Sequence, residues 1–162
     1  MKVRVSIILG MILSFWSGVV YATTFTVTNN LNEGVGSLRW AIEQSNAEEG
    51  NSKIVFDLAA PSDTITLTEL ITVSSSVELD GTIAGGKVTI QGPEIETLIH
   101  CVGVPTGGNF SLTSVNFGKW KSSTSTENNI AVMLDQIKEG GSANFSMNDV
   151  SVSGNAKSTT FV

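Results

Sequence analysis

Two carboxylates two positions apart are the residues best placed to do chemistry. Glu78 and Asp80 lie in the segment VELDG. Residues at i and i+2 of a strand share a face, so both point outward if Val77 and Leu79 point to the core. Such a pair could bind a cation or a sugar, or act as the acid and base of a polysaccharide-cleaving enzyme. The interpretation we favour is simpler: Asp80-Gly81 is a turn signal, and Glu78 is its solvated neighbour.

One histidine and one cysteine, His100 and Cys101, are adjacent in the apolar segment LIHCVGV. Because the chain has no second histidine and no cysteine pair, it lacks the ligand spacing of a zinc site. A lone cysteine also excludes an intramolecular disulfide. We therefore interpret both as strand residues, Cys101 being a small buried side chain, and expect neither a metal nor a cofactor.

Aromatic and basic residues meet in the segment FGKWK. Phe117, Lys119 and Trp120 could form an exposed platform for a glycan at the start of a polar stretch, residues 121–129, that we interpret as a loop. The alternative is that Phe117 covers the core and Trp120 shields the base of the loop. With Glu78 and Asp80, these three are the candidate binding residues.

The first 22 residues have the pattern of a secretory signal peptide. Lys2 and Arg4 form a basic start, an apolar run follows over residues 7–20, and VYA at residues 20–22 is a small-x-small cleavage site. The alternative is a retained membrane anchor, for which the apolar run is short of the roughly 20 residues needed. We expect an exported protein, located outside the cell, on its surface, in the outer membrane or in the periplasm.

The charge balance points away from anionic partners. The chain carries 15 acidic and nine basic residues, and two of the basic ones lie in the signal segment. Binding to nucleic acid or to an anionic membrane requires clustered lysine and arginine, and the sequence has no basic run. We therefore expect no nucleic-acid partner. We also expect no small-molecule cofactor.

The segment GSLRWAIEQSNA predicts the only helix. Ser37 is a suitable N-cap, and Leu38, Ala41 and Ile42 recur at the i, i+3, i+4 spacing of one helix face. Arg39 lies on the opposite, solvent-facing side. The helix should end before Gly50, where a left-handed residue would stop it.

The rest of the chain predicts short strands separated by Gly, Pro, Asn, Ser and Asp. The expected strands, after a first one within residues 23–30, are residues 54–58, 64–67, 71–73, 77–79, 88–90, 98–102, 110–115, 130–134 and 145–152. Such strands at roughly ten-residue spacing fit a sandwich, a barrel or a solenoid.

Internal repetition favours the solenoid over the sandwich. NFSLTSV at residues 109–115 recurs as NFSMNDV at residues 144–150. LIHCVGV and IAVMLDQI occupy similar places about 32 residues apart, and VELDG and VTIQG look like two strands of one turn. We expect turns of about 22 to 35 residues, the longer ones carrying loops.

The stretch from residue 24 to residue 92 resembles the start of exported right-handed parallel β-helix proteins. The shared motif, (Cys or Gly)-Ser-Leu-Arg-x-Ala-Ile, reads GSLRWAI here, and related motifs occur in polymorphic outer-membrane proteins and autotransporter passengers. The resemblance implies an all-β solenoid whose first turn is covered by a short helix. Its capping residues would be Ser37, Leu38, Arg39, Ala41 and Ile42.

Three functions follow from this resemblance. The expected one is a non-catalytic exported adhesin or passenger, which presents loops to a glycan or another ligand on a host or neighbouring cell. The alternatives are a carbohydrate-active β-helix enzyme, either a lyase or a hydrolase, and a truncated fragment of a longer outer-membrane protein whose membrane barrel is missing. The expected organisation is a signal peptide over residues 1–22, a strand and capping helix over 23–52, and rungs over 53–162 that stop without a second cap.

Overall fold

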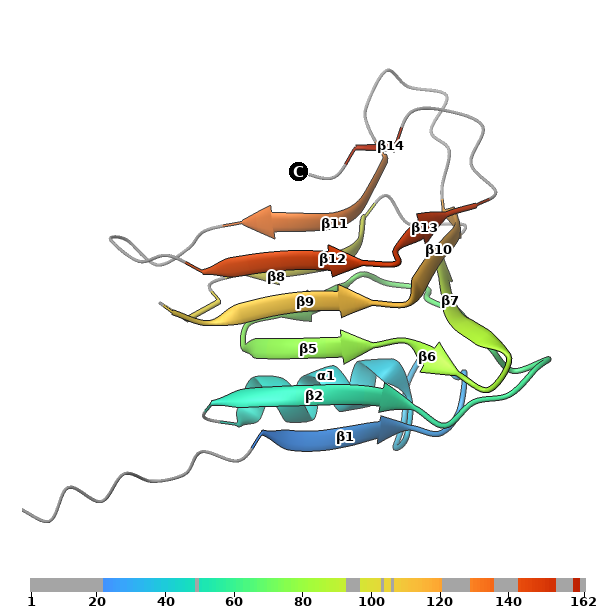
Figure 1. Ribbon diagram of the computed structural model, residues 1–162, viewed down its shortest axis with the longest axis horizontal. Helices are drawn as coiled ribbons and strands as arrows, with labels where there is room; N and C mark the ends of the chain where they lie inside the picture. The colour runs from blue at the N-terminus through green and yellow to red at the C-terminus, as the bar shows by residue number, and fades with distance from the viewer. Residues whose placement is uncertain are drawn as a thin grey trace, which may run out of the picture.

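The computed structural model describes residues 22–48, 50–92, 97–102, 104–105, 107–120, 129–135, 143–153 and 159–160. The expected signal segment, apart from residue 22, and most of the polar stretch after Trp120 lie outside these ranges. Within them the chain is mostly β-strand with one helix, α1 (Leu38–Ala47), as the sequence predicts (Figure 1).

Fourteen short strands make up the rest of the described fold. They are β1 Thr23–Val27, β2 Asn51–Phe56, β3 Thr64–Thr66, β4 Ile71–Val73, β5 Ser76–Asp80, β6 Thr82–Ile83, β7 Gly86–Gly92, β8 Thr97–Val102, β9 Asn109–Thr113, β10 Val115–Trp120, β11 Asn129–Asp135, β12 Asn144–Asn148, β13 Ser151–Val152 and β14 Thr159–Thr160.

The strands form three parallel sheets that the chain visits in rotation. Sheet A has the order β1-β2-β5-β9-β12, sheet B the order β13-β10-β7-β3, and sheet C the order β14-β11-β8-β4. From β2 onward each strand of sheet A is followed by one of sheet B and then one of sheet C. The strands of sheet A are stacked in chain order (Figure 1). The exception is β6, which forms a small antiparallel pair with β7.

The two copies of the internal sequence repeat form neighbouring strands that pair in register. Strand β12 pairs with β9 so that NFSMN lies residue for residue beside NFSLT, from Asn144 opposite Asn109 to Asn148 opposite Thr113. The second suspected repeat also pairs, with Ile130 of β11 opposite Thr97 of β8. Equivalent residues therefore stack in columns along each sheet.

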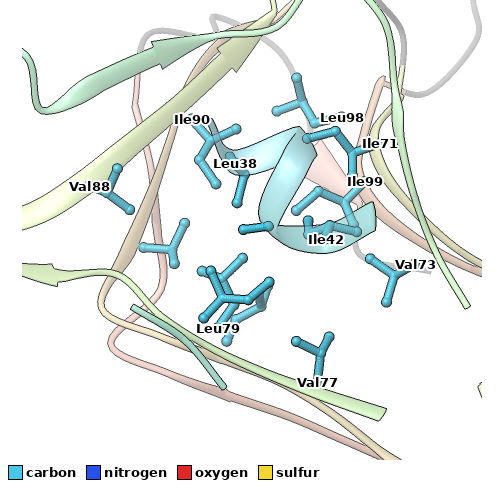
Figure 2. Packing of buried hydrophobic residues seen from close by; sticks show 14 of the residues in the cluster. Leu38, Ile42, Ile71, Val73, Val77, Leu79, Val88, Ile90, Leu98 and Ile99 are labelled. Carbon is cyan, nitrogen blue, oxygen red and sulfur yellow. The ribbon is translucent and has the colours of Figure 1, made fainter. Parts of the chain in front are cut away.

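Alternation along the strands places one face of each sheet in a common core. In β2, Ser52, Ile54 and Phe56 are buried while the residues between them are more exposed. Side chains from all three sheets meet around α1 (Figure 2). The labelled core residues are Leu38, Ile42, Ile71, Val73, Val77, Leu79, Val88, Ile90, Leu98 and Ile99.

Helix α1 lies in the chain between the first two strands of sheet A, where later turns have a strand in sheet B and one in sheet C. Ser37 is its N-cap, as predicted, and accepts a hydrogen bond from the Trp40 N–H at 3.1 Å. Leu38, Ala41 and Ile42 are buried, which confirms the predicted face. The helix packs against β1, β2, β4 and β5.

Arg39, predicted on the solvent-facing side, is half-buried and also binds the backbone of neighbouring segments. Its guanidinium group donates to the carbonyl oxygens of Glu69 at 2.8 Å, Leu70 at 2.9 Å and Asn32 at 3.2 Å. The planar guanidinium group of arginine has five N–H donors and can therefore bind several carbonyl oxygens at once. Arg39 therefore ties the start of the helix to the segment that leads into β4.

A second polar contact fixes the end of the helix. Asn46 donates to the Thr72 carbonyl at 2.8 Å and accepts from the Ser74 N–H at 2.8 Å. The buried hydroxyls of Ser45 and Ser75 lie 2.8 Å apart. Both ends of α1 are thus hydrogen-bonded to β4 or to the segments that flank it.

Candidate functional site

The outer face of sheet A carries polar side chains in two columns. The pairing registers place Asn51, Ser76, Asn109 and Asn144 in one column. They place Lys53, Glu78, Ser111 and Ser146 in the other. The residues of both columns occupy the alternate strand positions whose side chains point away from the core. Four strands therefore contribute to one continuous polar surface.

These two columns line a shallow hollow of about 350 Å³. Ala22, Ser52 and Val77 complete its lining. The groups that reach it are amides, hydroxyls and one lysine–glutamate pair, and none of the described residues in its lining is aromatic. The hollow therefore offers many hydrogen-bond donors and acceptors with little net charge.

Hydrogen bonds within the first column hold its side chains in place. The Asn144 amide donates to the Asn109 side-chain oxygen at 3.0 Å. The Ser76 hydroxyl accepts from the Asn109 N–H at 2.8 Å and donates to the Asn109 carbonyl at 3.2 Å. Asn109 and Asn144 both remain exposed, so their unused amide groups can reach a ligand.

The second column contains the carboxylates singled out in the sequence. Glu78 is exposed and Asp80 is half-buried, and both point outward as predicted. Lys53 lies 2.8 Å from Glu78 and 3.2 Å from Asp80 and bridges the two. Sequence reasoning missed Lys53 because it is 25 residues from Glu78. The two residues become neighbours only through the register in which β2 pairs with β5.

The pKa values of Asp80 and Lys53 shift in the directions that keep both groups charged. Hydrogen bonds from Thr82, and after them the contact with Lys53, lower the pKa of Asp80. Hydrogen bonds to Glu78 and then to Asp80 raise the pKa of Lys53. At neutral pH Asp80 is therefore a carboxylate and Lys53 an ammonium group, and the two form an ion pair.

Asp80 also begins the turn that the sequence indicated. Its carboxylate accepts a hydrogen bond from the Thr82 N–H at 3.2 Å, across Gly81. Gly81 is buried, and a Cβ there would contact the Ser114 carbonyl and lie 2.7 Å from Val88. The Asp-Gly pair is thus a tight corner between sheets A and B.

The expected aromatic platform needs correction at Phe117. The segment Val115–Trp120 is strand β10 and not the start of a loop, and Phe117 is fully buried. Its ring therefore belongs to the core and cannot contact a ligand, as the alternative interpretation held. Lys119 and Trp120 also belong to β10, but their side chains lie outside what the structure describes.

His100 and Cys101 lie on β8. Cys101 is buried, and burial raises its pKa to about 12, so the thiol stays protonated and unreactive. His100 stands in register with Thr72 of β4 and Met133 of β11. Among the described residues, no three His, Cys, Asp or Glu side chains gather to hold a metal ion.

The described fold is thus a mostly β protein built from three parallel sheets and one helix, with a polar hollow on sheet A. No known protein family, curated protein or solved structure matches the chain. In the part of the chain that the structure describes, no helix has the length and apolar character needed to span a membrane.

Proposed function

We propose that the chain is a right-handed parallel β-helix and serves as a non-catalytic, exported, adhesin-like protein that binds a glycan on its outer face. The rotation of the chain through three parallel sheets supports the β-helix, as does the pairing of the NFS repeats in register. The resemblance of GSLRWAI to exported proteins of this class supports export. Under this proposal α1 covers the first turn, as a terminal repeat of different form.

The polar hollow on sheet A is the observation that carries the binding role. Its amides and hydroxyls repeat from strand to strand at the spacing of a sheet, about 4.8 Å. A ligand that runs across the strands would therefore meet the same kind of group several times. A polyhydroxylated chain such as an oligosaccharide has the matching donors and acceptors along its length.

The same face favours binding over cleavage. Lys53 pairs with both nearby carboxylates, so the charged groups satisfy one another. A glycosidase needs one carboxyl with a raised pKa beside an ionised one. Here the pKa of Asp80 is shifted downward, toward a permanently ionised group. Asp80 is therefore not the proton donor that cleavage needs, whereas the amides and hydroxyls of this surface can position a sugar.

Binding of the purified chain to a panel of neutral and acidic oligosaccharides tests the proposal. We expect the double variant Asn109→Ala with Asn144→Ala to reduce binding of any retained oligosaccharide at least tenfold. The matched control is Gln91→Ala, whose side chain on sheet B bonds to Thr66 outside the hollow and should leave binding unchanged.

Two results would overturn this function. One is equal loss of binding in the Gln91→Ala control, which would place the site elsewhere. The other is shortening of a bound oligosaccharide that stops when Glu78 and Asp80 are both replaced by alanine, which would establish the enzyme instead.

A further inference from the structure

Strand β12 is the last strand of sheet A in the described chain, and one of its edges has no described partner. Natural proteins usually protect such an edge with charge, proline or a bulge. The sequence of β12, Asn-Phe-Ser-Met-Asn, contains neither a charged residue nor a proline. Met147 of β12 and Leu134 of β11 are each 40 % exposed.

The edge without a described partner presents the backbone groups of Phe145 and Met147. The Asn144 N–H donates to the Gly108 carbonyl at 2.9 Å, and the Asn148 carbonyl accepts from the Ser114 N–H at 3.0 Å. In a parallel pair, alternate residues direct both backbone groups to the same neighbour. Asn144, Ser146 and Asn148 therefore face β9, and the two residues between them face away.

We propose that β12 pairs with β12 of a second copy of this chain, antiparallel and with the twofold axis at Ser146. Because Asn-Phe-Ser-Met-Asn is nearly symmetric about its centre, this register places Phe145 opposite Met147 of the second copy and Asn144 opposite Asn148. Phe145 and Met147 then exchange backbone hydrogen bonds, and Ser146 faces its own counterpart in a pair without backbone hydrogen bonds.

Side-chain directions agree with this register. Met147 stands in register with the buried Leu112, and Phe145 stacks on Phe110 with ring centroids 5.7 Å apart, so both point to the core side. With a twofold axis perpendicular to the sheet, the core-facing sides of the two copies lie on the same face of the joined sheet. The pairing thus places the Met147 sulfur against an aromatic ring, a favourable contact, and covers the exposed Met147 and the half-buried Phe145.

The opposite edge of sheet A offers less apolar surface for such a contact. In β1, Val27 is fully buried and Phe25 is covered by the edge-on ring of Trp40, at 6.3 Å between centroids. Pairing of β12 with β1 of another copy would also be open-ended and would build fibres, whereas the symmetric pair closes after two copies. The observations therefore favour a closed dimer.

Cysteine crosslinking with a mass measurement tests the dimer. In a pair without backbone hydrogen bonds the two Cα atoms lie about 4.5 Å apart, within disulfide range. The Ser146→Cys chain should therefore form a covalent dimer under mild oxidation. The control Ser111→Cys lies one strand further in, about 14 Å from its counterpart, and should not crosslink. Buried Cys101 does not compete.

Light scattering of the unmodified chain should give the mass of two copies. The variant Ser146→Lys should raise the dimer dissociation constant about fivefold through like-charge repulsion across the axis, and Ser111→Lys should leave it nearly unchanged. A monomer at 100 µM (about 1.7 mg/ml for 17.1 kDa) would overturn the proposal. A dimer that Ser146→Cys fails to crosslink, or a mass that grows into polymers, would overturn it as well.

Discussion

The two ends of the described fold differ in how their apolar side chains are covered. At the N-terminal end α1 lies over the core, and Leu38 and Ile42 are at most 1 % exposed. At the other end Met147 is 40 % exposed, although its register partner Leu112 is fully buried. The same column thus holds a core residue and a surface residue. In this column, the burial of a side chain depends on whether a further strand or helix packs next to its own strand as much as on its residue type.

The largest expected effect comes from a substitution that disrupts the end of the fold covered by α1. Leu38→Asp places a charge among side chains of all three sheets, where an unpaired carboxylate loses its hydration. We expect loss of several kcal/mol of unfolding free energy and aggregation, since the core end and the edges of β3 and β4 become accessible.

Thermal unfolding and size-exclusion chromatography measure this effect. Gln44→Asp is the control, because Gln44 is exposed on the same helix and should tolerate the charge. If Leu38→Asp melts at the same temperature as the unmodified chain and keeps its size, α1 does not seal the core.

A matched pair of truncations sharpens the comparison of the two ends. Leu112→Ala should cost about 2–5 kcal/mol of unfolding free energy, as for a buried leucine that leaves a cavity. Met147→Ala, one strand later in the same column, should cost about 1 kcal/mol or less, because solvent already reaches the side chain. Urea unfolding of both variants at low concentration gives the two values. Equal losses would mean that both ends of the column are equally packed.

Arg39→Lys tests how firmly the helix is held. Lysine keeps the charge but cannot donate to three separate carbonyls in the fork geometry of arginine. Because these bonds are partly exposed, we expect a loss of about 1–2 kcal/mol. Chemical denaturation measures it, and Glu43→Gln on the exposed side of α1 is the control. No change in Arg39→Lys would show that the apolar face alone positions the helix.

The smallest expected effect concerns pH and the Lys53 cluster. The lowered pKa of Asp80 adds stability above its unfolded value, near 3.8, and this is lost as pH falls through the folded pKa. The raised pKa of Lys53 adds stability below 10.5 that is lost as pH rises through the folded pKa.

Replacing Lys53 should remove the alkaline dependence and weaken the acidic one. Lys53→Met should cost below about 1 kcal/mol near neutral pH, since the pair is solvent-screened. Melting temperatures between pH 2 and 11 measure it. An unchanged slope above pH 10 in the variant would contradict the assigned pairing.

Much of the fold could be predicted because local signals agree with it. Ser37 followed by an apolar i, i+3, i+4 face marks the helix start, and the structure has the same cap and the same face. The strand at residues 71–73 matches its prediction to the residue. The NFS repeat predicted equivalent positions, and β9 and β12 pair at that offset.

Strand β10 could not be predicted because its glycine looks like a break. A Cβ at Gly118 would lie 2.9 Å from the Thr89 side chain on the neighbouring strand β7. The glycine therefore marks a close approach within a sheet. The ladder is also irregular between Phe117 and Trp120, so alternation fails there.

Only part of the candidate site could be predicted from the sequence. The outward carboxylates follow from strand periodicity, but Lys53 and the asparagine column become neighbours only once the exact turn lengths are known. Those lengths differ from turn to turn: Lys53 and Glu78 are 25 residues apart, whereas Asn109 and Asn144 are 35 apart. The loops that change the length leave no periodic signal.

Contacts between the core side chains in solution test the stacked arrangement most directly. Nuclear Overhauser spectra of the chain should show one cross-peak series for each sheet: Phe110 to Phe145 in sheet A, Val88 to Val115 in sheet B and Ile99 to Val132 in sheet C. All three series together would establish parallel columns in register. Absence of any one series, or a cross-peak pattern of antiparallel hairpins among these strands, would contradict the arrangement on which the proposed β-helix and its binding face depend.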